Sequence, residues 1–280
     1  MPLSPPPNHT LTSWNVECGG YPDYYRSGAP NTQPILDTIT LIDPDTICFS
    51  DVFGWGDEQL RNQCLPSKFH GNSYFQPLED QWLLDTEGAH MKDVGVAIAT
   101  TAKHETPEII DLAGRCGLKT ILHLGTHGVR ICAIYLNHAL EDKRIEQAKA
   151  LINILAADKN EDIPTIIVGD LNAQEALTRV GWREKSWSRL VQLGALAFNA
   201  IHHPYGPVLR DLERREALEV FEQNGFHNAA TNEQRTALFP FARAFRVDHP
   251  YTKNLETSEY TTHSPTGSDH KPFSLKLHVS

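Results

Sequence analysis

The chain contains no long uninterrupted apolar segment. None of its apolar runs approaches the roughly 20 residues that a helix needs to cross a bilayer, so we expect no transmembrane segment. Residues Met1–Pro7 lack both the basic region and the apolar region of a secretory signal. We therefore expect a cytoplasmic protein in which residues 1–10 form a disordered, proline-rich N-terminus.

Cysteine pairs are also missing. The five cysteines are an odd number, and no two of them form a CxxC pair. This pattern argues against a disulfide framework and against a zinc site. Three of the cysteines lie in or beside apolar stretches, where a free thiol packs as a small hydrophobic group. A reducing compartment fits this usage.

Beyond residue 10 the sequence has no long linker, repeat or low-complexity tract, which predicts a single domain over residues 11–280. The net charge is −10, from 25 basic and 35 acidic side chains. Such a chain is not typical of proteins that hold nucleic acid by charge alone. Nucleic acid is not excluded, because carboxylates that bind Mg²⁺ add to the negative total. No feature predicts an oligomer, and we expect a monomer.

Short apolar runs alternate with segments of helical periodicity. Apolar spacing predicts helices over Gln33–Ile42, Glu141–Ala157 and Arg214–Asn224. Two runs within 119–136 flank Gly125–Gly128 and predict a β-hairpin. The remaining expected strands are Leu11–Glu17, Asp45–Asp51, Val94–Ala99, Pro164–Asp170, Phe245–Asp248 and Pro272–Val279. Hairpins mixed with helices predict an α/β protein with mixed or antiparallel sheets.

Asp170 directly follows the apolar run Ile166–Val168, so a carboxylate emerges from a buried strand. Asn172 points to the same side as Asp170 if the backbone stays extended. A carboxylate here can orient or deprotonate a water, and the amide can donate to a phosphate oxygen. The alternative is an ordinary turn at the end of a strand, because Gly, Asp and Asn all favour turns.

A second polar group, Ser268–Lys271, precedes the last expected strand. Asp269 would suit Mg²⁺, which prefers carboxylate oxygens, and a protonated His270 would stabilise charge on a phosphoryl oxygen. Asp248 can orient His270 and keep it protonated. The competing interpretations are a solvated turn for 268–271 and a simple ion pair between Asp248 and Arg246.

Taken together, these groups resemble the endonuclease/exonuclease/phosphatase superfamily of Mg²⁺-dependent phosphoesterases. The resemblance covers nearly the whole chain after residue 10, and Gly-Asp-Leu-Asn with Ser-Asp-His at this separation is its most specific part. The matching segments are Ser13–Glu17, Asp45–Asp51, Gly95–Ile98, Leu136–Leu140 followed by Arg144 and Gln147, Gly169–Asn172, Val247–Asp248 and Ser268–His270.

The resemblance implies a two-sheet mixed β-sandwich flanked by helices, with the active site at one edge and one or two Mg²⁺ or Mn²⁺ ions. Asp170 would activate the nucleophilic water and Asn172 would help to bind the phosphate. His138 and His270 would contact the scissile phosphate, with Asp248 supporting His270. The residues implied as metal ligands are Asn15, Glu17, Asp51 and Asp269.

Two positions depart from the family pattern. Ser50-Asp51 replaces the usual Gln-Glu, which sets the metal carboxylate one methylene further back and requires a small backbone shift or a bridging water. Pro250 follows Asp248 where the family continues a strand. Because proline cannot donate to a β-ladder, we expect a local break after Asp248.

The substrate is less clearly encoded. Aromatic and basic side chains alternate in Trp182–Arg189 and Phe239–Arg246, a pattern that suits bases beside phosphates, although tryptophans packed into a core would give the same pattern. We therefore expect a nuclease acting on nucleic acid. The alternatives are a phosphatase or phosphodiesterase for a small-molecule or lipid phosphate (phosphoinositide or sphingomyelin), and a non-catalytic scaffold that binds a phosphorylated partner.

Overall fold

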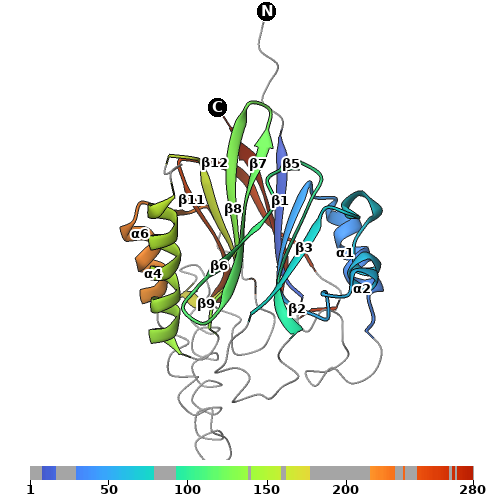
Figure 1. Ribbon diagram of the computed structural model, residues 1–280, viewed down its shortest axis with the longest axis horizontal. Helices are drawn as coiled ribbons and strands as arrows, with labels where there is room; N and C mark the ends of the chain where they lie inside the picture. Colours follow the sequence, from blue (N-terminus) through green and yellow to red (C-terminus); the bar gives the residue numbers. More distant parts are fainter. Residues whose placement is uncertain are drawn as a thin grey trace, which may run out of the picture.

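The computed structural model of the chain describes residues 8–16, 30–78, 93–137, 140–158, 162–176, 215–230, 236, 245–264, 267–268 and 270–279. Within this part, two β-sheets lie face to face and helices cover their outer faces (Figure 1).

The first sheet has the strand order β12-β13-β1-β2-β4-β3. Its central strands β1 and β2 are parallel to each other, whereas β1 is antiparallel to β13. The strands are β1 (His9–Asn15), β2 (Thr46–Phe53), β3 (Ser73–Pro77), β4 (Val94–Thr100), β12 (Glu256–Thr262) and β13 (Phe273–His278).

The second sheet has the order β10-β11-β9-β8-β7-β5, with β6 also paired to β7. Only β8 and β9 are parallel. The strands are β5 (Lys103–His104), β6 (Glu108–Asp111), β7 (Cys116–Leu124), β8 (His127–Tyr135), β9 (Thr165–Ala176), β10 (His227–Asn228) and β11 (Phe245–Lys253). The mixed α/β sandwich expected from the sequence is confirmed.

Helices α4 (Glu141–Ala157) and α6 (Glu216–Gln223) cover the second sheet, and α1 (Gln33–Ile42) and α2 (Glu58–Cys64) cover the first (Figure 1). A 3-10 turn, η2 (Ser67–Phe69), follows α2. Three buried apolar layers result: one between the two sheets, one under α4 and α6, and one under α1 and α2. The two sheets are therefore held as one rigid support.

The predicted helices over Gln33–Ile42 and Glu141–Ala157 are present with these bounds, and the third is shorter, at Glu216–Gln223. The predicted hairpin is formed by β7 and β8. Helix α1 starts with a proline at its first turn, where a missing N–H costs nothing, and ends at Asp43 in a left-handed conformation. Asp57 caps α2 by accepting from the backbone N–H groups of residues 59 and 60.

The expected break after Asp248 is wrong. Strand β11 continues through Pro250 to Lys253, and its one irregularity lies before Asp248, between Arg246 and Asp248. The carbonyl of Pro250 accepts from the N–H of Ala229, beside the two-residue strand β10. A residue's N–H and C=O point to the same edge of an antiparallel strand. The donor that proline lacks would therefore face β10, and no hydrogen bond to β9 is lost.

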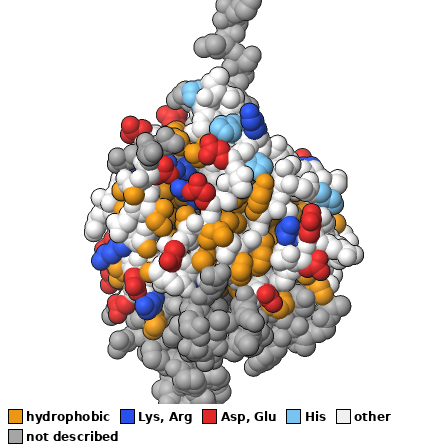
Figure 2. Space-filling model, in the orientation of Figure 1, with side chains coloured by type: hydrophobic (Ala, Val, Ile, Leu, Met, Phe, Trp, Pro, Cys, Tyr) orange, Lys and Arg blue, Asp and Glu red, His pale blue; other side chains and the backbone are white. Residues whose placement is uncertain are grey.

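The four described cysteines, at positions 48, 64, 116 and 132, are free and buried. Burial raises the pKa of the Cys132 thiol to about 12, so this side chain packs as an apolar group. No helix in the described part of the chain is both long and apolar enough to span a membrane. On the face drawn in Figure 2, hydrophobic side chains gather across the middle and acidic and basic groups are intermixed around them.

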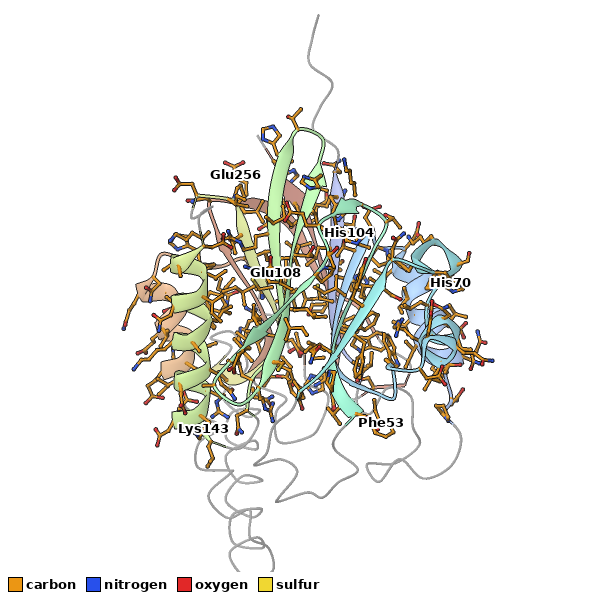
Figure 3. All side chains as sticks on the ribbon, viewed as in Figure 1. Phe53, His70, His104, Glu108, Lys143 and Glu256 are labelled. Carbon is orange, nitrogen blue, oxygen red and sulfur yellow. The ribbon has the colours of Figure 1, made fainter. Side chains whose placement is uncertain are left out.

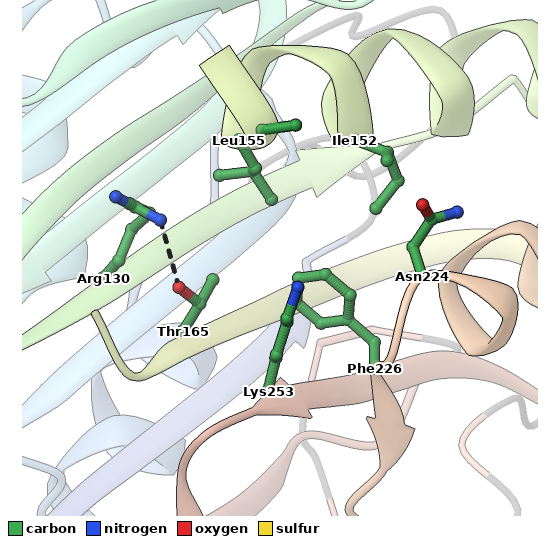
Figure 4. A pocket seen from close by; sticks show the side chains of 8 residues that line it. Arg130, Ile152, Leu155, Thr165, Asn224, Phe226 and Lys253 are labelled. Carbon is green, nitrogen blue, oxygen red and sulfur yellow. Dashed lines mark hydrogen bonds between the residues drawn. The ribbon is translucent and has the colours of Figure 1, made fainter. Parts of the chain in front are cut away.

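A small cavity of about 100 Å³ lies between α4, α6 and the second sheet (Figure 4). Its two cations, Arg130 and Lys253, lie near the C-terminal ends of the two helices, where positive charge is favourable. Arg130 is also paired with Asp158, the C-cap residue of α4, at 3.2 Å. These contacts give the cations a structural role.

Candidate functional site

Polar side chains from both sheets meet at one end of the sandwich. Asn15 is the last residue of β1, Asp170 lies on β9, Asp248 lies on β11, and His270 precedes β13. Phe53 at the end of β2 and Lys143 at the start of α4 mark this end in Figure 3, opposite Glu256. Strands β1, β2 and β9 run toward this end, so the residues that end or follow their apolar parts converge there.

Asp170 is the most constrained of these residues. Its side chain is buried, and each carboxylate oxygen accepts one hydrogen bond: Oδ2 from Asn15 Nδ2 at 2.9 Å and Oδ1 from the backbone N–H of Asn172 at 2.8 Å. Burial, followed by the nearby charge of Asp248, raises the pKa of Asp170 to about 7, against the smaller lowering effect of His270. A carboxyl group of this kind can exchange a proton near neutral pH.

The backbone conformation on either side of Asp170 depends on the residue types at positions 169 and 172. Gly169 has φ +139, and a Cβ at this position would lie 1.9 Å from the carbonyl oxygen of Ile134 on β8, so only glycine fits. Asn172 has φ 50, which means that the extended backbone does not persist to it. Its side-chain Nδ2 donates to the carbonyl of Leu136 at 3.1 Å. Asn172 therefore fixes Asp170 and the end of β8 at the same time.

Asp248 and His270 form a buried pair. His270 Nδ1 lies 2.9 Å from Asp248 Oδ2, and both side chains are less than a tenth exposed. A hydrogen bond from Nδ1–H to the carboxylate fixes the orientation of the ring. The other carboxylate oxygen, Asp248 Oδ1, is buried and has no hydrogen-bond partner.

Two residues hold the backbone of His270 in place, and sequence reasoning did not assign them this role. The indole N–H of Trp14 donates to the carbonyl of His270 at 3.1 Å. Ser268 Oγ accepts from the N–H of His270 at 3.0 Å and donates to the carbonyl of Asn15 at 2.7 Å. Both residues stand inside the segments that carry the family resemblance, but only the fold reveals contacts between groups about 250 residues apart.

Asp51 lies on β2 beside this cluster. Asn15 is paired with Ser50 in the parallel ladder, so Asp51 is one residue beyond the partner of Asn15. The register between β2 and β4 shifts between Phe49 and Val52, and Asp51 has φ 54. This bulge is the kind of backbone shift that the shorter carboxylate was expected to need.

The segment that leads to His138 is fastened to α4. The N–H of Asn137 donates to Gln147 Oε1 at 2.8 Å, and its carbonyl accepts from Arg144 Nη1 at 3.0 Å. Asn137 Oδ1 accepts from the N–H of Leu140 at 2.8 Å. Arg144 and Gln147, which belong to the matching segments, therefore support the end of β8.

Three of the predicted site residues, Glu17, His138 and Asp269, lie outside the described residues. So do Trp182–Arg189 and most of Phe239–Arg246, the segments that suggested nucleic acid. Arg246 is described: it is buried, and its guanidinium lies 5.5 Å from the centre of the Tyr260 ring. This arginine packs inside the protein.

Two buried carboxylates lie close together in the described cluster, which favours a cation beside them. Asp170, Asp248 and His270 offer ligand atoms that all lie within 4.8 Å of one another. Burying carboxylates this close together is costly unless positive charge or protons compensate. The buried Oδ1 of Asp248 without a partner points to the same requirement. The oxygen donors of Asn15 and Asp51 beside it suit a hard divalent cation.

A two-sheet sandwich with a buried carboxylate cluster and an oriented histidine at one end defines a class of phosphoesterases. The model of the Endonuclease/Exonuclease/phosphatase family matches residues 12–270, which is most of the chain. The chain belongs to this family.

Solved structures share the fold. An endonuclease/exonuclease/phosphatase from Beutenbergia cavernae matches with a TM-score of 0.65 and 15% identity, over 97% of this chain and 72% of that one. The human Nocturnin catalytic domain with bound sulfate matches with a TM-score of 0.62 and 16% identity, over 97% of this chain and 93% of that one. A mannosyl-6-phosphatase from Bacteroides thetaiotaomicron matches with a TM-score of 0.58 and 15% identity, over 97% of this chain and 100% of that one. No curated protein matches the chain.

Proposed function

We propose that this protein is a divalent-cation-dependent phosphodiesterase that hydrolyses a phosphate ester at the Asp170–Asp248–His270 cluster, with nucleic acid as the substrate. The observation that carries the proposal is the burial of a carboxylate whose pKa is about 7 beside an oriented Asp–His pair. Perturbed groups gathered in this way are characteristic of catalytic sites.

In this proposal Asp170 accepts a proton from a water molecule, whose oxygen forms a bond to phosphorus while the bond to the leaving oxygen breaks on the opposite side. Asn15 and the N–H of Asn172 hold the two carboxylate oxygens in place for this step. His270, held by Asp248, donates to a phosphoryl oxygen. The side chain of Asn172 and His138 complete the proposed contacts to the phosphate.

Among the described residues, Asn15 and Asp51 are the proposed cation ligands, and Glu17 and Asp269 complete the set from the sequence. All four offer side-chain oxygen atoms, the ligands that Mg²⁺ and Mn²⁺ prefer. A bound divalent cation supplies charge neutralisation at the phosphoryl oxygens. Asp170 and His270 then provide proton transfer and orientation.

Support for nucleic acid comes from the aromatic and basic residues of Trp182–Arg189 and Phe239–Arg243. A second candidate is a small or lipid-linked phosphate ester. The net charge of −10 is unfavourable for a long polyanion, and a mannosyl-6-phosphatase shares the fold over nearly the full length of both chains.

The first experiment measures nicking of a supercoiled plasmid with Mg²⁺, Mn²⁺ or EDTA. We expect cation-dependent nicking by the wild type and a loss of about 10²-fold or more in Asp170→Ala and His270→Ala, as is typical when a proton-transfer group is removed. His123→Ala is the matched control, because His123 lies on β7 and is 39% exposed at its side chain.

Absence of nicking with every cation would overturn the nucleic-acid assignment. The same variants are then assayed on sugar phosphates, phosphoinositides and sphingomyelin. Hydrolysis of one of these that disappears in Asp170→Ala would establish the second candidate. Hydrolysis that persists in both variants would show that the reaction does not use this cluster.

A further inference from the structure

Thr236 bonds to the backbone at Asp248 and at Lys271, the residue that follows His270. It is fully buried, and its Oγ1 accepts from the N–H of Val247 at 3.2 Å and from the N–H of Asp248 at 3.1 Å. Its carbonyl accepts from the N–H of Lys271 at 2.6 Å. One residue therefore bonds to the backbone at Asp248 and to the backbone directly after His270.

The contact on the Asp248 side falls on a defect in the second sheet. The register of β11 against β9 shifts between Arg246 and Asp248: the single residue Val247 of β11 stands opposite residues 171–174 of β9, so Val247 has no regular partner and the extra residues lie on β9. A bulge leaves backbone groups without their ladder partners and turns the strand, which changes the direction of the side chains. The hydroxyl of Thr236 accepts the N–H of Val247, inside this irregularity, and the N–H of Asp248, next to it, which would otherwise be buried at a cost.

Three consecutive backbone groups at His270 and Lys271 are held by hydrogen bonds from other parts of the chain or from Ser268. The N–H of His270 is held by Ser268 Oγ and its carbonyl by the indole of Trp14. The next N–H, that of Lys271, is held by Thr236. Trp14 and Ser268 connect His270 to β1 of the first sheet, whereas Thr236 connects it to β11 of the second sheet, where Asp248 lies.

We propose that Thr236 is a positioning residue that sets the distance between Asp248 and His270 by joining the two segments that carry them. The inference deepens the proposed function and rests on it where activity is measured. Because the 2.9 Å contact between His270 Nδ1 and Asp248 Oδ2 spans two segments, a loss of the link frees one side to shift against the other. Small displacements of catalytic groups carry large rate penalties.

The test compares Thr236→Val, which keeps the shape and removes the hydroxyl, with Thr236→Ser, which keeps the hydroxyl. We expect Thr236→Val to lower kcat about tenfold to a hundredfold with KM nearly unchanged, as for other groups that orient catalytic residues. Thr236→Ser restores most of the rate. Thr120→Val is the matched control, since Thr120 is a buried threonine on β7 that donates to the carbonyl of Glu105.

A second measurement does not need a substrate. The Nδ1–H proton of His270 gives a low-field NMR signal when it bonds to a carboxylate, and it is assigned by its loss in His270→Ala. We expect this signal to be present in the wild type, Thr236→Ser and Thr120→Val and to shift or broaden in Thr236→Val. If the wild-type protein has no esterase activity, the proposed function is wrong. The NMR signal of His270 then still decides whether Thr236 positions the pair.

Three results would overturn the inference. The first is an unchanged His270 signal in Thr236→Val. The second is an equal loss of kcat in Thr120→Val, and the third is a failure of Thr236→Ser to restore the rate.

Discussion

His249 follows Asp248 in the chain but belongs to a different environment. Its ring is fully buried, and Nε2–H donates to the carbonyl of Ala173 at 2.9 Å, which fixes β9 just after Asn172. Burial is the main cause that lowers the pKa of His249 to about 4. Two adjacent residues therefore have different roles: Asp248 bonds to His270, whereas His249 stays neutral and supports β9.

The lowered pKa of His249 predicts a pH-dependent stability. Between pH 4 and 6.5 the unfolded chain binds a proton at His249 and the folded chain does not. The free energy of unfolding therefore decreases as the pH falls. The stabilisation is complete above pH 6.5 and is lost as the pH drops toward 4. It amounts to about 3 kcal/mol, since one pKa unit corresponds to about 1.4 kcal/mol.

His249→Gln can donate to the same carbonyl but does not titrate. We expect its free energy of unfolding, measured by urea denaturation from pH 4 to 8, to fall less steeply with acid than that of the wild type. Equal slopes for the two proteins would contradict the assignment. His123→Gln is the control, since its side chain is 39% exposed and should leave the slope unchanged.

Helix α4 is attached to the site end of the molecule by a buried ion pair. Arg144 Nε donates to Glu141 Oε2 at 2.6 Å, and both side chains are fully buried. Glu141 Oε1 also accepts from the N–H of Ala217 on α6 at 2.9 Å, and Arg144 holds the carbonyl of Asn137. Helix α4, helix α6 and the segment after β8 thus share two charges, and neither charge can be removed alone at low cost.

Arg144→Met is expected to lower the free energy of unfolding by about 3–5 kcal/mol, because it leaves the Glu141 carboxylate buried without its cation. The double variant with Glu141→Gln should recover part of this loss. Lys143→Met is the control on the next residue, where an exposed ion pair with Glu146 contributes about 0–1 kcal/mol. Similar losses for Arg144→Met and Lys143→Met in chemical denaturation would count against the prediction.

The sequence was most informative about elements with strong local periodicity. Helix α4 and the β7–β8 hairpin follow from residues close to one another in the chain. The interpretation of Pro250 failed because it depended on which neighbouring strand the missing N–H would face. That strand is β10, which ends 22 residues before Pro250 (250 − 228 = 22). Asp170, Asp248 and His270 could be named from their residue types, whereas the backbone contacts of Trp14, Ser268 and Thr236 depend on chain segments that only the fold brings together.

The site joins the two sheets of the molecule. Asn15 and Asp51 come from the first sheet and Asp170 and Asp248 from the second. The proposed cation ligands Asn15 and Asp51 stand on the neighbouring strands β1 and β2, so a cation held by both binds only after these strands have paired. Such binding stabilises the folded protein by mass action.

Addition of Mg²⁺ or Mn²⁺ should therefore raise the Tm of the protein. At a cation concentration of 100 times Kd the free energy of unfolding should increase by about 2.7 kcal/mol. Asp51→Ala should lose most of this increase. Asp37→Ala, which removes an exposed carboxylate on α1, should keep it. A Tm that does not respond to either cation in calorimetry would contradict the proposed cation site.

The position of β1 and β13 has a further consequence for synthesis. These strands are neighbours in the interior of the first sheet, and Trp14 bonds to His270, 256 positions later. On the ribosome β1 emerges first, and its partner emerges only after more than 250 further residues. During most of translation the first sheet therefore lacks β12 and β13, and β1 is its edge strand. An incomplete nascent chain therefore contains no assembled Asp248–His270 pair.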